Sequence, residues 1–361
     1  MFNAENLSKR LDGFRNRLAE LHLEAALITK RESYMYLSGF TGTSANLLIT
    51  SKKAYLLTDF RYMEQSARQA PLFQIVQHKP DINETIGELI HSEQARSIGF
   101  EDHAVSYSAG RALSDRFKDM EFKGMGLAVD DMRSIKDEQE IEIIAKAVKI
   151  ADDALMQVLP LIRPGITELD VAAELEYKMK KLGAAGPSFE TIVASGLRSS
   201  MPHGVASDKK LELGDAITID FGALYNHYCS DITRTVFLGQ PDKRLIDIYN
   251  IVLEAQLTSE RGAVRGRTGR EVDRIARDII YSKGYEGKFG HGLGHGVGLE
   301  IHESPRLSMS GEKALENRMA VTVEPGIYVE GLGGVRIEDT IIIRDDKPQV
   351  LTQAPKEIII L

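Results

Sequence analysis

Residues 215–238, DAITIDFGALYNHYCSDITRTVFL, and residues 319–343, MAVTVEPGIYVEGLGGVRIEDTIII, decide the fold of this chain. Both stretches have the β-branched, apolar composition and the central turn of a strand pair. Each follows two segments with helical periodicity. These segments are residues 137–161 and 168–182 before the first pair, and residues 244–264 and 269–284 before the second. The same order of elements occurs twice, which predicts a domain built from two similar halves.

Each strand pair carries two carboxylates among apolar residues: Asp220 and Asp231 in the first, Glu324 and Glu338 in the second. A buried carboxylate without a partner is costly, so these acids need compensation. Residues on paired strands approach one another, and two facing halves would bring all four acids together. Each close pair would then repel by about 4 kcal/mol at ~4 Å and a dielectric of ~20. The pattern therefore predicts two divalent cations among the acids, ~3.5–4 Å apart.

A segment rich in glycine and histidine, FGHGLGHGVGLEIHE at residues 289–303, lies between the strand pairs. Its glycines allow close approach of the backbone, and His291, His295 or His302 can complete a metal sphere. One imidazole among oxygens suits manganese, cobalt or iron(II) better than zinc, which stays a further alternative. The segment lacks the G-K-[ST] ending and the preceding apolar strand of a phosphate loop, which excludes that reading.

These segments resemble the pita-bread metallopeptidases, the family that contains prolidase, aminopeptidase P, methionine aminopeptidase and creatinase. The matching segments are IDFGA, SDITRT, HGLGHGVGLEIHE, VEPGIY and GGVRIEDT. The resemblance covers the whole chain and implies an α+β pita-bread catalytic domain. It also implies a ligand set for two divalent metal ions. In that set Asp231 and Glu338 bridge both ions, Asp220 completes one, and His295 with Glu324 completes the other.

The same resemblance implies catalytic roles. Glu324 would accept the proton of the attacking water. His203 in MPHG and His302 in LEIHE would face the substrate, stabilise the tetrahedral intermediate and orient the proline side. Arg336, two residues before the last acid, would brace the carboxylates from behind. His291 matches a flanking histidine for which a direct catalytic role and a structural one are equally open.

Residues 1–130 alternate between strand and helical patterns, which predicts a separate α/β domain. The family resemblance implies that this domain is similar to the creatinase N-terminal domain. The strand-like segments are residues 25–29, 46–50, 54–59, 73–77 and 96–102, and the helical segments are residues 7–23, 62–70 and 82–90. A polar stretch, VDDMRSIKDEQE, follows this part of the chain. We therefore expect the catalytic domain to comprise residues 131–361.

Methionine aminopeptidases of this family usually lack such an N-terminal domain. Its presence therefore favours the proline-specific branch of the family. Creatinases share the layout but lack the full metal set. The resemblance thus implies hydrolysis of the bond between an N-terminal residue and proline in short peptides. It also implies a homodimer in which the neighbour's N-terminal domain closes the active site.

Dipeptidase activity requires recognition of the free carboxylate that follows proline, a task suited to a guanidinium fork. Arg306 in HESPRLS is the candidate, although an exposed loop charge would have the same sequence signature. Aminopeptidase P, which accepts longer peptides, therefore stays the alternative to prolidase. A non-catalytic pita-bread binding module is a third hypothesis, and missing ligands would be its usual mark.

The composition is that of an ordinary soluble globular protein, with 361 residues, 43% of them hydrophobic and 27% charged. The net charge of −8, without a basic block, argues against nucleic acid or an anionic membrane as partner. The first residues lack the apolar core of a signal peptide, so we expect a cytoplasmic protein. A single cysteine, Cys229, cannot form an intramolecular disulfide and is expected to be buried in a strand.

Overall fold

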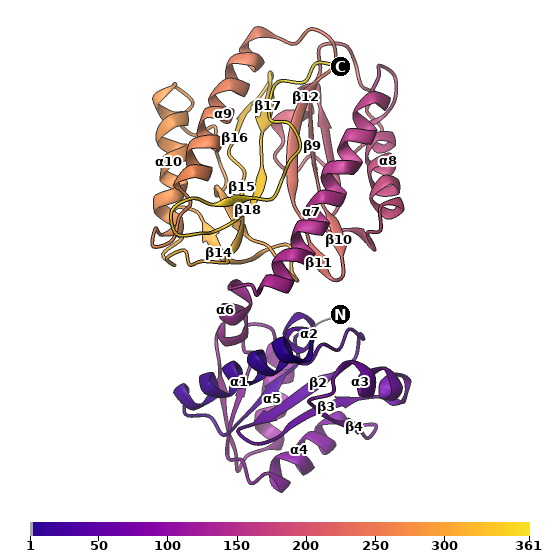
Figure 1. Ribbon diagram of the computed structural model, residues 1–361, viewed down its shortest axis with the longest axis vertical. Coiled ribbons are helices and arrows are strands. Elements are labelled where there is room, and N and C mark those ends of the chain that lie inside the picture. Colours follow the sequence, from indigo (N-terminus) through magenta and orange to yellow (C-terminus); the bar gives the residue numbers. More distant parts are fainter. Residues whose placement is uncertain (1–2) are drawn as a thin grey trace. The chain divides into compact units, whose positions relative to one another are not determined.

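The computed structural model describes residues 3–361 and divides the chain into two compact units. The first unit ends at Arg133 and the second is Ser134–Leu361. Each unit has its own sheets and its own helices (Figure 1). No helix within residues 3–361 is long and apolar enough to cross a membrane.

The first unit is built on a six-stranded mixed sheet with the order β4-β3-β2-β1-β5-β6. Its strands are β1 (Ala25–Ile28), β2 (Asn46–Thr50), β3 (Ala54–Thr58), β4 (Gln74–Gln77), β5 (Ser97–Phe100) and β6 (Glu121–Gly124). Its helices are α1 (Ala4–Glu20), α2 (Arg31–Ser38), the 3₁₀ helix η1 (Phe60–Tyr62), α3 (Met63–Gln69), α4 (Ile82–Ser92), α5 (Tyr107–Arg116) and α6 (Ala128–Ser134). Apolar residues of α4 and α5 pack against β1, β2 and β3. The five strands predicted here are confirmed, whereas α2, η1, α5, β6 and α6 were not predicted.

The first half of the second unit packs α7 (Glu138–Val158) and α8 (Glu168–Lys181) against a three-stranded sheet. A capping box between Asp137 and Glu140 starts α7. The sheet has the order β12-β9-β8, with β8 (Ile192–Ser195), β9 (Ala216–Phe221) and β12 (Ile232–Phe237). A smaller sheet contains β7 (Gly186–Pro187), β10 (Ala223–Tyr225) and β11 (Tyr228–Cys229), and the 3₁₀ helices are η2 (Leu159–Leu161) and η3 (Gly196–Ser200). Cys229 is buried in β11, as expected.

The second half packs α9 (Lys243–Gly262) and α10 (Gly269–Ser282) against a five-stranded sheet with the order β14-β13-β15-β18-β19. Its strands are β13 (Gly294–Gly296), β14 (Glu303–Leu307), β15 (Ala320–Val323), β18 (Asp339–Ile342) and β19 (Gln349–Val350). A separate hairpin joins β16 (Gly326–Val329) to β17 (Gly333–Arg336). The predicted repeat of two helices followed by a strand pair is therefore present in both halves.

Each predicted strand pair differs from the sequence expectation in one respect: it is interrupted. The pair β9–β12 continues as β10–β11 in another sheet, and β15–β18 continues as β16–β17. In the first pair a Cβ on Gly222 would lie 1.8 Å from the Ser230 carbonyl oxygen, so the two backbones cross closely there. In the second pair Pro325, which has no N–H to donate, separates β15 from β16. The interruptions place the four acids at or beside strand ends.

Candidate functional site

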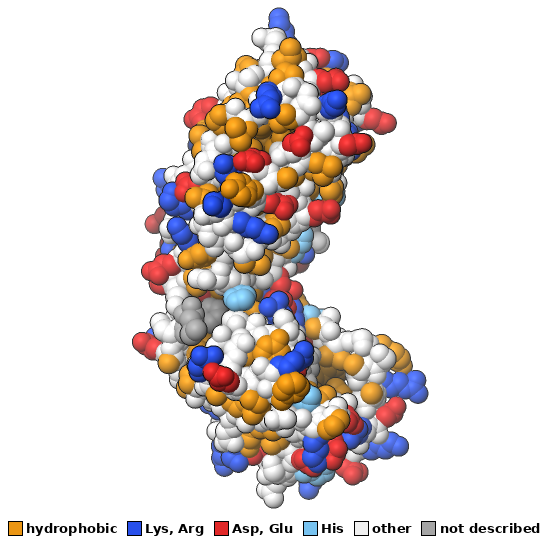
Figure 2. Space-filling model, turned by 90° about the vertical axis from the view of Figure 1, so that its right-hand side faces the viewer, with side chains coloured by type: hydrophobic (Ala, Val, Ile, Leu, Met, Phe, Trp, Pro, Cys, Tyr) orange, Lys and Arg blue, Asp and Glu red, His pale blue; other side chains and the backbone are white. Residues whose placement is uncertain are grey.

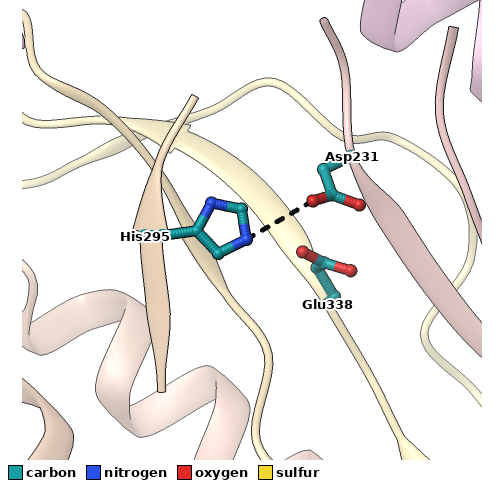
Figure 3. A group of neighbouring side chains, drawn as sticks. All are labelled: Asp231, His295 and Glu338. Carbon is teal, nitrogen blue, oxygen red and sulfur yellow. Dashed lines mark ion pairs between the residues drawn. The ribbon is translucent and has the colours of Figure 1, made fainter. Parts of the chain in front are cut away.

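Three of the predicted ligands converge on one buried point: Asp231, His295 and Glu338. Each offers one ligand atom, and these atoms all lie within 4.8 Å of one another. Figure 3 shows the three side chains pointing toward one another from separate segments. Asp231 directly precedes β12, His295 lies in β13, and Glu338 directly precedes β18. The His295 Nε2 atom is 3.5 Å from the Asp231 Oδ2 atom.

The other two predicted ligands, Glu324 and Asp220, line the same cavity of about 330 Å³. Glu324 follows β15, and its Oε1 atom is 3.4 Å from the His295 Nε2 atom. Asp220 lies in β9 opposite Thr233 of β12, so it does not face Asp231 directly across the ladder as the sequence suggested. The cavity nevertheless contains all five side chains, contributed by both halves of the unit.

Two glycines allow the His295 strand to enter the site. A Cβ on Gly294 would lie 2.0 Å from the Thr322 carbonyl oxygen, and one on Gly296 would lie 2.3 Å from that of Ser304. Any larger residue would push β13 away from its two neighbours. The expected close approach of the backbone in this glycine-rich segment is therefore present.

A chain of hydrogen bonds orients the carboxylates from behind. The Arg336 guanidinium donates through Nη2 to the Asp220 Oδ2 atom at 2.6 Å and through Nε to the Thr233 hydroxyl at 3.2 Å. That hydroxyl donates in turn to the Glu338 Oε2 atom at 2.7 Å. Sequence reasoning expected contacts of this kind for Arg336 but assigned nothing to Thr233. A signal was available, because Thr233 lies two residues after Asp231, and alternate residues of an extended segment point to the same side.

His291 belongs to the same chain through Tyr328. Arg336 donates to the Tyr328 hydroxyl at 2.8 Å, and that hydroxyl is 2.9 Å from the His291 Nε2 atom. Because a carbonyl can only accept, the His291 Nδ1–H donates to the Gly292 carbonyl at 2.8 Å, and the Nε2 atom of the neutral ring accepts from the tyrosine O–H. Burial lowers the pKa of His291 to about 4, which keeps the ring neutral. Both ring nitrogens are thus engaged within the protein, an arrangement that suits a structural role.

The remaining predicted residues, His203, His302 and Arg306, are exposed side chains that line the cavity. The His302 ring centroid is 4.4 Å from that of His295, with the two rings nearly perpendicular. Arg306 lies in β14, directly opposite His295 in β13. His203 lies in the loop after η3, and the carbonyl of the preceding residue, Pro202, accepts a hydrogen bond from Arg336 at 3.1 Å. The structure therefore places all the predicted site residues around one cavity.

Comparison with known protein families accounts for nearly the whole chain. Residues 142–345 match "Metallopeptidase family M24", and residues 10–135 match "Creatinase/Prolidase N-terminal domain". The chain belongs to metallopeptidase family M24. The predicted fold class, an α/β N-terminal domain followed by a pita-bread catalytic domain, is confirmed for this M24 peptidase.

Full-length relatives of this M24 peptidase include proteins named for cleavage at proline. A Xaa-Pro dipeptidase from Pyrococcus furiosus is 41% identical over 98% of this chain and 100% of its own length. The solved structure of a Xaa-Pro dipeptidase from Bacillus anthracis has a TM-score of 0.96 and 47% identity, covering 99% of this chain and 100% of that one. The structure of an X-Pro aminopeptidase from Thermotoga maritima has a TM-score of 0.91 and 41% identity, covering 97% and 99%.

Divalent metal ions, which membership of M24 implies, fit the donor atoms of the site. The buried Asp220 Oδ1 and Glu338 Oε1 atoms have no hydrogen-bond partner within residues 3–361, although buried polar atoms normally have one. The His295 Nδ1 atom is 3.1 Å from the Gly296 carbonyl, so it carries the proton and leaves the Nε2 lone pair facing the acids. Oxygen atoms and one imidazole lone pair directed at a shared point form a suitable set for a divalent cation.

The electrostatics of this M24 site support the same conclusion. Burial, followed by the charges of neighbouring acids, raises the pKa of Asp231 and of Glu338 well above their ordinary values. Burial likewise raises the pKa of Glu324 to about 8, with Asp220 adding to the effect. Burial lowers the pKa of His295 to about 3, which keeps its ring neutral. The side chains alone oppose full ionisation of these acids, and bound cations would reverse that preference.

Proposed function

We propose that this M24 peptidase is a metal-dependent Xaa-Pro dipeptidase, which hydrolyses the bond between an N-terminal residue and proline. The observation that carries the proposal is the convergence of Asp231, His295 and Glu338 in a cavity of about 330 Å³, a size suited to a small ligand. The full-length relatives named Xaa-Pro dipeptidase, at 41% and 44% identity, support the choice of substrate class.

The proposed metal site would hold two divalent ions. Asp231 and Glu338 would contact both ions, Asp220 would complete the sphere of one, and His295 with Glu324 that of the other. Ions bound there would supply Lewis acidity toward the scissile carbonyl and would lower the pKa of a coordinated water. The oxygen-rich donor set favours manganese or cobalt, with zinc and iron(II) as alternatives. Activity after reconstitution of metal-free protein with each ion separately would identify the preferred metal.

The protein side chains would divide the remaining tasks. Glu324 lines the cavity beside His295 and would accept the proton of the attacking water. His203 and His302, on the exposed side of the cavity, would donate to the developing oxyanion and orient the proline. Arg336 would keep Asp220 in place through its 2.6 Å contact, and Tyr328 would hold the other end of the guanidinium.

Replacing His203 with alanine should lower kcat by about 10²-fold, the effect of removing one oxyanion donor, and should leave metal content unchanged. The reason is its position, because His203 is exposed on a loop and does not belong to the buried donor group. Steady-state kinetics and metal analysis of the same preparation would test this. His78→Ala, in the first unit, is the matched control. Equal loss of metal in His203→Ala would contradict the assignment.

Arg306 is proposed to bind the free carboxylate of the dipeptide. It lines the cavity and lies opposite His295, and its planar guanidinium can donate two parallel hydrogen bonds to a carboxylate. The alternative function, aminopeptidase P activity on longer peptides, is favoured by the close structural similarity to the X-Pro aminopeptidase from Thermotoga maritima. Turnover of Xaa-Pro compared with Xaa-Pro-Yaa-Zaa would distinguish the two activities. Faster cleavage of the tetrapeptide would contradict the dipeptidase assignment.

Arg306→Gln should raise KM for a Xaa-Pro dipeptide by about 10–100-fold, because a charged hydrogen bond contributes ~1.5–3 kcal/mol. The same substitution should hardly alter KM for the corresponding Xaa-Pro amide, which has no terminal carboxylate. Arg306→Lys should lose part of the affinity, since lysine keeps the charge without the fork. An equal change for dipeptide and amide would show that Arg306 does not recognise the carboxylate.

Short proline-containing peptides are thus the proposed partners. We propose further that the protein is a cytoplasmic homodimer and that it does not bind nucleic acid or membrane. Lys and Arg side chains are interspersed with Asp and Glu side chains over the face drawn in Figure 2, in keeping with the net charge of −8. Light scattering on the purified protein would determine the oligomeric state.

A further inference from the structure

A buried cluster of charged and polar side chains lies behind the strands that carry Asp231 and Glu338. We call it the rear cluster, and it consists of Arg234, Gln256, Glu260, Asp339 and Lys356. Arg234 and Asp339 are 1% and 0% exposed, so this ion pair is fully removed from water. Successive residues of a strand point to opposite faces, which puts Arg234 on the reverse side from Thr233. The mechanism proposed above makes no use of the cluster.

Arg234 forms hydrogen bonds to the main chain beside the proposed metal site. Its Nη1 atom donates to the Glu338 carbonyl and, at 2.9 Å, to the Thr233 carbonyl. Thr233 is also the residue whose hydroxyl holds the Glu338 carboxylate. The Nη2 atom of the same guanidinium donates to the Ala354 carbonyl at 2.7 Å, and its Nε atom donates to the Pro355 carbonyl at 2.9 Å. One side chain therefore joins the Glu338 backbone to the last segment of the chain.

Lys356 anchors that last segment to the same place. Its ammonium group contacts the Asp339 Oδ2 atom and the Glu260 Oε2 atom, the latter at 3.0 Å. The Gln256 amide donates to the same two oxygens at 3.1 Å. Asp339 directly follows Glu338, so every contact on Asp339 restrains the direction in which the Glu338 side chain leaves the strand. The Lys356 side chain is 21% exposed, whereas that of its partner Asp339 is fully buried.

Such a cluster needs an explanation other than stability. Taking several charges out of water often offsets what their attraction contributes, so apolar residues could fill the same space at similar stability. What apolar residues could not do is hold two carbonyls and a neighbouring carboxylate in fixed directions. Groups behind a metal ligand commonly change metal affinity or activity by about 10–100-fold when they are removed.

We propose that Arg234 and Lys356 are positioning residues, which tie the C-terminal segment to Glu338 and thereby set the geometry of the metal site. The inference rests on the proposed function, because it assigns a purpose to the cluster only if Glu338 binds cations. Neither residue touches the cavity, so their effect would reach the substrate only through the ligand.

The test uses Lys356→Gln, Lys356→Arg and a control, Lys347→Gln, which removes the same charge at an exposed position near the same end of the chain. Binding of Mn²⁺ to metal-free protein is measured by calorimetry at a temperature where every variant is folded. We expect Lys356→Gln to weaken Mn²⁺ binding by ~10-fold and to lower kcat at limiting Mn²⁺, with KM for the peptide within about twofold of wild type. Lys356→Arg should restore most of the affinity, and Lys347→Gln should match wild type.

Several outcomes would overturn the inference. Unchanged Mn²⁺ affinity in Lys356→Gln would do so, as would an equal loss in Lys356→Arg. If Lys356→Gln does not fold, Glu260→Gln removes the other partner of the ammonium and carries the same expectation. Wild-type protein that binds no cation would contradict the proposed function itself, whereas tight binding by wild type and variants alike would overturn only the role of the rear cluster.

Discussion

Glu338→Gln should abolish tight cation binding and lower kcat/KM by about 10³-fold or more. The substitution keeps the size of the side chain but removes a charge proposed to contact both ions. Losing ~4 kcal/mol of charge stabilisation in the transition state corresponds to about 10³-fold in rate. Kinetics at saturating Mn²⁺, together with metal analysis after desalting, would measure both effects. Glu330→Gln, on the exposed turn between β16 and β17, is the matched control.

The stability of the metal-free variant gives an independent check. Burial and the neighbouring acids raise the pKa of Glu338 well above its ordinary value. A carboxyl group whose pKa is higher in the folded state than in the unfolded state lowers the free energy of unfolding at any pH above its unfolded pKa. Metal-free Glu338→Gln should therefore unfold at the same temperature as metal-free wild type or above it. A variant that kept its ions and its activity would show that Glu338 is not a ligand.

The four candidate acids could be predicted from the sequence because their chemistry is local, whereas the choice of His295 among three histidines came from the family resemblance. Acids such as Asp220 and Glu338 stand out in strands that are otherwise apolar, and the glycines around His295 mark a close approach of backbones. The repeated order of helices and strands then indicates that both halves face one site. The structure brings the side chains named in that way to a single cavity.

What the sequence did not indicate depends on contacts between distant segments. Thr233 holds Glu338 across a separation of 105 residues, and Arg234 joins strand β12 to residues 354 and 355. Neither contact leaves a local pattern. The interruption of the strand pairs likewise depends on how closely Gly222 approaches Ser230 in space.

Three of the unpredicted elements of the first unit, β6, α5 and α2, lack a periodic apolar signal. The edge strand β6 has no buried residue, so alternation is absent from its sequence. In α5 only Leu113 is buried, which leaves no apolar stripe. In α2 the opposite holds, because six of its eight residues are buried and no polar face defines a period. Periodicity identifies elements that bury one face in the core, whereas β6 and α5 bury at most one residue and α2 buries most of its residues.

Removing the cations should abolish peptidase activity and lower the melting temperature of the second unit. A ligand at 100 times its Kd stabilises the folded state by about 2.7 kcal/mol, and each kcal/mol shifts the melting temperature by ~2–4 °C in a domain of this size. We therefore expect a decrease of about 5–10 °C after dialysis against a chelator, and recovery with Mn²⁺. The direction follows from the site, where burial, followed by the charges of neighbouring acids, raises the pKa of Asp231 and of Glu338, and a bound cation would favour their ionised forms. Calorimetry can follow this unit against the first one, whose residues 3–133 contain no comparable group of ligand atoms and whose transition should therefore not move. A chelated protein with unchanged melting and full activity would mean that Asp231, His295 and Glu338 converge for a reason other than metal binding.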